Sequence, residues 1–168
     1  MPNPLIEHFV SVWERDAKHA VRLLKALPVE QYDFRPDAGG RSMGELAWHL
    51  AEVDAYITWG IEHGFGSGGK PPGIERPRTV EALAPGFERI HADAVARVGK
   101  LTDQDLQRHI PFFDGKPMKV EDMLWGAVLH HLIHHRGQLV LMCRLAGSVP
   151  PGIYGPTREE TAAMKSKA

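Results

Sequence analysis

Apolar residues recur every three or four positions in four long stretches of the chain, which is the period of one face of an α-helix. The stretches run from Asn3 to about Pro28, from Ser42 to about Gly64, from Val80 to Leu101, and from about Glu121 to Leu145. Each is about 20 residues long and would form a helix of roughly 30 Å. Four helices of this length predict an all-α protein, a four-helix bundle.

Local signals mark where these helices begin. Asn3 followed by Pro4 is an N-cap with the proline favoured at the first helical position. Ser42 and Glu45 have the spacing of a capping box at the start of the second helix. Pro85 interrupts the third stretch, so its helix is expected to start there, after a short turn.

Shorter elements are expected between and after the long helices. Residues 101–106, LTDQDL, are typical of a capped turn. In HIPFFDGKPMKV, residues 109–120, Asp114 and Gly115 lie between short apolar pieces, which predicts a small hairpin before the last long helix. The polar tail to Ala168 has room for one short helix. No repeat or strand-rich region divides the chain, so residues 1–168 are expected to form a single domain.

Composition and charge exclude several classes of protein. The 20 Lys and Arg are spread among 21 Asp and Glu, with a net charge of −1, so no basic face for nucleic acid is evident. No apolar run approaches the roughly 20 residues that span a bilayer. Cys143 is the only cysteine, which rules out an intramolecular disulfide framework and fits a reducing compartment. The N-terminus resembles no signal peptide, so the cytoplasm is the expected location.

The ten histidines are unevenly distributed, and four fall in the six residues HHLIHH that begin at His130. At 100° per residue, His131 and His135 share one helical face, whereas His130 and His134 are turned roughly 100° away. The same projection puts His49 on the apolar face of the second helix. The apolar neighbours of the His131 pair on its face are Leu124, Val128, Leu139 and Met142.

Three imidazoles on core faces need hydrogen-bonding partners, because an unsatisfied buried polar group costs about 1 to 3 kcal/mol. A divalent metal would satisfy His49, His131 and His135 together, and imidazole suits Zn, Ni, Fe or Cu. Three ligands leave a coordination position for water or substrate, which points to chemistry. A structural alternative remains open, in which each histidine is an ordinary hydrogen-bonded core residue.

Three residues near these histidines have candidate roles. Glu52 has two interpretations: it orients the imidazole of His49, or, as we favour, it is a solvated helix charge. Gln138 lies close to the direction of His131, where it would hydrogen-bond near a metal. Arg136 points away and is expected to pair with an acid or a neighbouring helix terminus.

The chain resembles the DinB family, the DinB/YfiT-like group of metalloenzymes. The matching pieces are FRPDAGGRSMGELAWHLAEVDAYI (34–57), LTDQDL (101–106) and LHHLIHHRGQLVLMCRLAG (129–147). The resemblance implies that His49, His131 and His135 are metal ligands. It also implies a four-helix bundle with a long crossover connection, zinc or nickel at the site, and frequent homodimerisation. His130 and His134 fill positions where the family varies, and Gly86 follows Pro85 inside the third helix, but neither departure removes a ligand.

Family members with established activities include transferases and isomerases that use low-molecular-weight thiols, such as bacillithiol, mycothiol or glutathione. By this resemblance we expect a metal-dependent enzyme that acts on a small-molecule substrate, with thiol transfer preferred over hydrolysis. A non-catalytic metal-binding stress-response protein is the alternative. A second apolar stripe on the last helix, opposite the histidine pair, predicts either cover by the connecting loops or a homodimer; it consists of Leu129, Ile133 and Val140.

Overall fold

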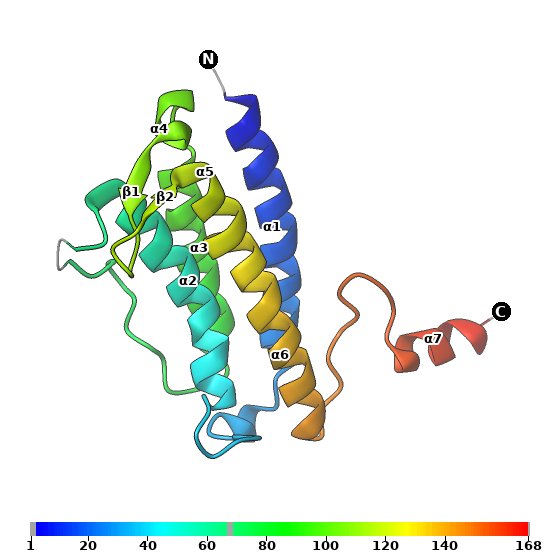
Figure 1. Ribbon diagram of the computed structural model, residues 1–168. Helices are drawn as coiled ribbons and strands as arrows, with labels where there is room; N and C mark the ends of the chain where they lie inside the picture. The colour runs from blue at the N-terminus through cyan, green and yellow to red at the C-terminus, as the bar shows by residue number, and fades with distance from the viewer. Residues whose placement is uncertain (1–2, 67–68, 168) are drawn as a thin grey trace.

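A computed structural model describes residues 3–66 and 69–167 of the chain. Four long helices lie side by side in a bundle (Figure 1), which confirms the all-α fold. The first three are α1 (Pro4–Lys25), α2 (Met43–His63) and α3 (Leu83–Val98), and the fourth consists of η2 (Met123–His130) followed by α6 (His131–Leu145).

The long crossover connection lies between α2 and α3. These two helices run in the same direction, so the chain after α2 returns along the length of the bundle before α3 begins (Figure 1). Its described parts are residues 64–66 and 69–82. The indole N–H of Trp48 donates to the Ile74 carbonyl over 3.0 Å, which fixes this returning chain against α2. Both α1 and α6 run opposite to α2 and α3.

The expected helix starts are present, with one correction. The Asn3 side chain accepts from the N–H groups of Leu5 and Ile6, and Ser42 and Glu45 form a complete capping box. The third helix begins at Leu83, so the prediction of a start at Pro85 was two residues late. Pro85 fits inside the first turn because the N–H that it lacks would have no partner within the helix there.

Gly86 has a packing role in α3. A Cβ atom at this position would lie 2.7 Å from Cζ3 of Trp48, a side chain that is 1% exposed. The glycine therefore lets α3 approach the indole on α2 closely. This contact explains why a residue with poor helix propensity lies within the third helix.

The segment between α3 and the last long helix contains the expected turn and hairpin. The turn is the short helix α4 (Asp103–Gln107), which starts at a capping box made by Thr102. Strands β1 (His109–Pro111) and β2 (Pro117–Lys119) pair antiparallel, which confirms the hairpin. Gly115 has a φ of 77° in the turn between them, a conformation that favours glycine.

The last long helix is not the single α-helix expected from about Glu121. It begins as the one-turn helix α5 (Val120–Asp122), continues as the π-helix η2, and becomes α-helical only at His131. At the junction the His131 N–H bonds to the Gly126 carbonyl, five residues back. π-Helical turns are rare and often occur at functional sites. Apolar periodicity does not predict them.

The core is continuous along the bundle, and Trp13, Trp48, Phe9 and Phe87 are among its largest buried side chains. The second stripe of the last helix is covered within the chain. Leu129 is 3% exposed, and Ile133 and Val140 pack against the core. This stripe therefore gives no argument for a subunit interface. Cys143 is buried and packs in the core as a small apolar side chain.

Two short elements complete the chain, the 3-10 turn η1 (Val29–Gln31) and the C-terminal helix α7 (Arg158–Lys165). α7 projects from the bundle (Figure 1), and Arg144 holds it through two 2.9 Å hydrogen bonds to Glu159. In the described part of the chain, no helix combines the length and apolarity needed to cross a bilayer.

Candidate metal centre

The three predicted histidines come together between α2 and α6. The ring centroid of His49 lies 5.5 Å from that of His131 and 4.7 Å from that of His135. The centroids of His131 and His135 are 4.6 Å apart. One ring nitrogen from each residue lies within 4.8 Å of the other two, and all three residues are half-buried. The cluster therefore lies at the edge of the core and can be reached from solvent.

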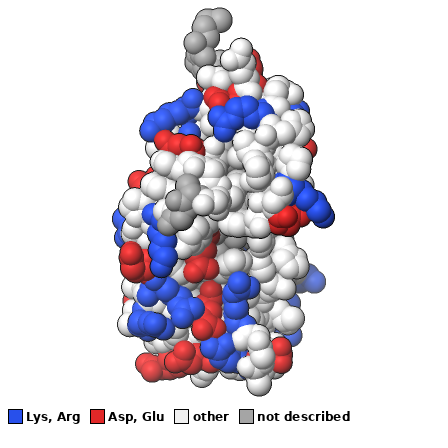
Figure 2. Space-filling view, turned by 60° about the vertical axis from the view of Figure 1, so that its left-hand side comes forward, with Lys and Arg blue, Asp and Glu red and all other residues white. Residues whose placement is uncertain are grey.

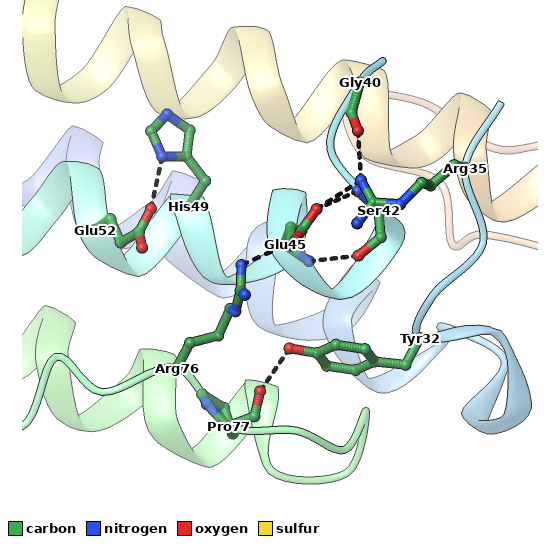
Figure 3. A network of polar contacts seen from close by, with 9 residues as sticks. All are labelled: Tyr32, Arg35, Gly40, Ser42, Glu45, His49, Glu52, Arg76 and Pro77. Atoms are coloured by element: carbon green, nitrogen blue, oxygen red, sulfur yellow. Dashed lines mark hydrogen bonds and ion pairs between the residues drawn. The ribbon is translucent and has the colours of Figure 1, made fainter. Parts of the chain in front are cut away.

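Each imidazole has an acceptor on its outer side. Nδ1 of His49 lies 2.9 Å from Oε2 of Glu52 (Figure 3), and Nδ1 of His135 lies 2.7 Å from Oε1 of Gln138. His131 hydrogen-bonds to the backbone of Ala127. Because oxygen acceptors carry no proton, the imidazoles donate, which places the proton of His49 and His135 on Nδ1 and leaves Nε2 with its lone pair. Glu52 is thus a partner of His49 and not a solvated charge, which corrects our preferred interpretation.

The inner nitrogens of the two α6 histidines face one another. Nε2 of His131 and Nε2 of His135 are 2.7 Å apart. With each ring donating from its other side, both Nε2 atoms are acceptors, and two lone pairs at this distance repel each other. A cation between them turns the repulsion into attraction. This donor set therefore fits a metal ion.

The protonation of the pair agrees with this interpretation. The pKa of His135 is lowered to about 4, mainly by burial and also by the neighbouring His49 and His131, against the raising effect of Gln138. The pKa of His131 is also lowered, first by burial and then by His49. Both rings are therefore neutral at pH 7, the form in which imidazole binds metal.

The geometry suits a borderline transition metal. With metal–nitrogen bonds of about 2.1 Å, ligand nitrogens on one tetrahedral ion lie about 3.4 Å apart. The observed separations, 2.7 Å for one pair and at most 4.8 Å overall, bracket this value, so small ring rotations suffice. Among the described residues, no other group of three His, Cys, Asp or Glu side chains lies close enough to hold an ion. An all-imidazole set is compatible with a divalent ion such as zinc or nickel.

A cleft of about 360 Å³, here called the α6 cleft, opens beside the histidines. One wall is the loop at residues 36–41. The other wall is the outer face of α6, and buried Leu46 and Met142 lie between the two. The residues of that face are His135, Gln138, Leu141 and Leu145.

Polar contacts hold the loop wall of this cleft in place (Figure 3). Arg35 donates to the Gly40 carbonyl and pairs with Glu45 over 2.8 Å. Glu45 also accepts from the backbone N–H of Ser42 over 2.8 Å, as part of the capping box. Its bond to Arg35 is the main cause that lowers the pKa of Glu45 to about 2. The start of α2 and the cleft loop are therefore fixed by one carboxylate.

The other histidine-segment residues lie outside the cluster. His130 and His134 are exposed. Arg136 turns to the opposite side of α6, where its Nη1 pairs with Oδ1 of Asp16 over 2.8 Å. This buried ion pair confirms the expectation that Arg136 binds an acid.

A helical bundle with three histidines gathered between two helices defines a class of α-helical proteins with a candidate metal site. The family model described as the DinB family matches residues 1–167, and the chain belongs to this family. The protein named YrdA of Bacillus subtilis (strain 168) is 30% identical over 158 residues, which cover 94% of this chain and 92% of YrdA.

Solved structures agree with this assignment. A DinB-like protein from Bacillus cereus ATCC 10987 is 28% identical and superposes with a TM-score of 0.74, covering 88% of this chain and 97% of that one. A second DinB-like protein, from Bacillus subtilis, is 21% identical with a TM-score of 0.69, covering 90% and 99% of the two chains. The second likeness supports the fold alone.

Sequence reasoning missed three parts of the site. The π-helix and the Ala127 contact of His131 had no signal in the apolar pattern. Arg41, on the cleft loop, lies near enough to His131 to contribute to its lowered pKa. Its only signal was its position immediately before the Ser42 cap.

Proposed function

We propose that this chain is a metal-dependent enzyme in which His49, His131 and His135 hold one divalent ion, zinc or nickel, and that it catalyses a thiol-dependent transfer on a small molecule. The observation that carries the proposal is the 2.7 Å separation of Nε2 of His131 from Nε2 of His135, two rings whose outer sides already have acceptors. The half-buried position of the cluster and the adjoining α6 cleft favour catalysis over a closed structural site, because substrate can reach the ligands.

The protein side chains have separate tasks in this proposal. Glu52 and Gln138 keep the imidazoles of His49 and His135 oriented and hold their protons on Nδ1. A bound divalent ion would lower the pKa of a coordinated water or thiol. The α6 cleft holds the electrophile beside the cluster and limits the access of water.

Thiol transfer is preferred to hydrolysis because of the family resemblance and because soft thiolate ligands suit a borderline ion. Metal-dependent hydrolysis and non-catalytic metal binding are the competing functions. We place the reaction in the cytoplasm, since the lone Cys143 fits a reducing compartment.

Elemental analysis of protein purified without an affinity tag tests the first step. We expect about one zinc or nickel per chain, lost in His49→Ala, His131→Ala and His135→Ala but retained in the matched control His130→Ala, whose side chain is exposed. Metal-free wild-type protein that takes up no ion on reconstitution would contradict the proposal. It would favour histidines that are ordinary hydrogen-bonded residues.

A turnover screen tests the second step. Consumption of a low-molecular-weight thiol with an epoxide or an activated halide should require the bound ion and stop on chelation. Chelator-sensitive ester hydrolysis without thiol consumption would favour the hydrolase. Stoichiometric metal without any turnover would favour the binding protein.

We also propose a homodimer, which rests on the family resemblance alone, because the stripe of Leu129, Ile133 and Val140 is covered within the chain. Light scattering at micromolar concentration should give twice the 18.7 kDa chain mass, and a monomer would refute the dimer.

A further inference from the structure

The α6 cleft has a polar end and an apolar end. The polar end lies beside the histidine cluster, where the cleft is lined by His135, Gln138 and Arg41. Further along α6 the wall consists of Leu141 and Leu145, which are 60% and 57% exposed. Ten residues separate His135 from Leu145, so this wall is about 15 Å long. A ligand that fills the cleft therefore needs a polar head and an apolar body.

The polar end offers hydrogen-bond donors. Over residues 3–66 and 69–167, Arg41 makes no hydrogen bond or ion pair, so its guanidinium is available to a ligand. The Gln138 amide is oriented, because its Oε1 accepts from Nδ1 of His135. Its NH₂ group consequently points away from His135 and is left as a donor. A planar guanidinium and an amide NH₂ together match the two oxygens of a carboxylate.

The charge of the cleft limits the anion. Asp37 is the only acidic residue among the described side chains that line it, and Arg41 is the only Lys or Arg. Oδ1 of Asp37 accepts a hydrogen bond from the Gly39 N–H over 3.3 Å, so this carboxylate is held within the loop. A single guanidinium beside one carboxylate can balance one negative charge on a ligand, but not the two charges of a phosphate dianion.

We propose that the α6 cleft binds a small monocarboxylate with an apolar body, and that Arg41 and Gln138 hold its carboxylate. The body lies along Leu141 and Leu145. Because the carboxylate end is the end nearest the histidines, the group that reacts is a substituent close to the carboxylate, at its second or third carbon. This last statement rests on the proposed function, whereas the binding of the carboxylate does not.

Titration calorimetry with 4-phenylbutanoate and its neutral analogue 4-phenylbutanamide tests the binding step. Metal-free protein should bind the acid about tenfold or more tightly than the amide, since hydrogen bonds to charged groups contribute more than neutral ones. Arg41→Gln should remove this preference, and Arg41→Lys should retain part of it. The matched control Arg22→Gln, on the exposed surface of α1, should leave it unchanged.

Two further measurements distinguish the contribution of the carboxylate charge from that of the apolar contacts. Leu141→Ser should weaken the binding of the acid and the binding of the amide by the same factor, because it shortens the apolar wall and leaves the hydrogen-bond donors in place. Inorganic phosphate should compete with the acid only weakly. Equal affinities for acid and amide, an unchanged preference in Arg41→Gln, tighter binding of phosphate, or no binding of either probe would each overturn the inference.

The same titrations distinguish this inference from the proposed function. If the protein takes up no metal but metal-free protein prefers the acid through Arg41, the proposed function fails and the carboxylate site stands. If the protein takes up metal and consumes thiol but shows no preference for the acid, the proposed function stands and the carboxylate site fails.

Discussion

Two polar clusters lie on different faces of α6, and consecutive residues, His135 and Arg136, belong to them. The Arg136 cluster is closed. Nη1 of Arg136 lies 2.8 Å from both the carbonyl oxygen and Oδ1 of Asp16, and both side chains are 2% exposed. Its Nη2 donates to the Tyr154 hydroxyl, which donates in turn to Asp16, and the guanidinium lies 5.0 Å from the Tyr154 ring centroid.

The histidine cluster is incomplete by comparison. Its outer nitrogens have acceptors, but Nε2 of His131 and Nε2 of His135 face each other without a proton between them. The cluster is half-buried and opens beside a cleft. A closed, fully paired network fixes the fold, whereas an oriented network that lacks a cation is what a binding site requires.

The largest effect should come from breaking the closed cluster. Asp16→Ala leaves the Arg136 charge buried without its partner, so the free energy of unfolding should fall by about 3 to 5 kcal/mol in urea denaturation. Glu88→Ala is the control, because its pair with Lys25 is exposed and should contribute at most about 1 kcal/mol. A loss below 1 kcal/mol in Asp16→Ala would remove the distinction between the two clusters.

Removing the α6 histidines should abolish the stabilisation by zinc but leave the stability of the metal-free protein almost unchanged. In His131→Ala/His135→Ala, the stability of metal-free protein should change by less than about 1 kcal/mol, because the rings are half-buried and their facing nitrogens repel. Wild-type protein should gain about 2.7 kcal/mol at a zinc concentration 100 times the Kd, and the variant should gain nothing. Thermal denaturation with and without zinc measures both quantities. A large loss in the metal-free variant would indicate a structural role instead.

A smaller effect is expected from the outer partner of His49. Glu52→Ala removes the acceptor that fixes Nδ1 as the protonated nitrogen, so zinc affinity should fall about 10- to 100-fold. Glu52→Gln keeps an oxygen acceptor and should lose less. Competition with a chromophoric chelator measures these affinities. Glu62→Ala, a partly exposed acid on the same helix, should match wild type, and an equal loss there would show that the effect is not local.

The smallest effect concerns the cleft loop and depends on pH. The folded-state pKa of Glu45 is lowered to about 2, first by its bond to Arg35, so its contribution to stability is present above its ordinary pKa of 4.5. This contribution is lost as the pH falls from about 4.5 to about 2. Glu45→Gln should therefore lose less stability on acidification than wild type does, measured by urea denaturation at pH 5 and pH 3. Parallel pH profiles for the two proteins would contradict this role of Glu45.

Much of the fold could be predicted from local signals. The cap residues Asn3 and Ser42 and the Asp114-Gly115 turn act on their immediate neighbours, so their effects do not depend on the rest of the chain. The start of α3 was misplaced because a proline is compatible with the whole first turn of a helix, so it does not mark a single start. The convergence of His49 with the α6 pair required the resemblance, since helical projection gives the face of a residue but not the helix that it meets.

The details of the site depended on tertiary structure. The spacing of Glu52 and His49 is common to every i, i+3 pair on a helix, and only the orientation of the imidazole decides whether they bond. Arg41 lies in a loop, and no periodicity places a loop against α6.

The π-helix η2 makes the site sensitive to insertions and deletions. It ends at His130, directly before the first α6 ligand, and the same helix is anchored below that ligand by Arg136. If one residue between Met123 and His130 were deleted without a change of winding, one end of the helix would turn relative to the other by about 100°, the angle that one helical residue spans. Chain length in this segment is therefore constrained together with the identity of the ligands, and the segment includes Ala127, whose backbone hydrogen-bonds to His131.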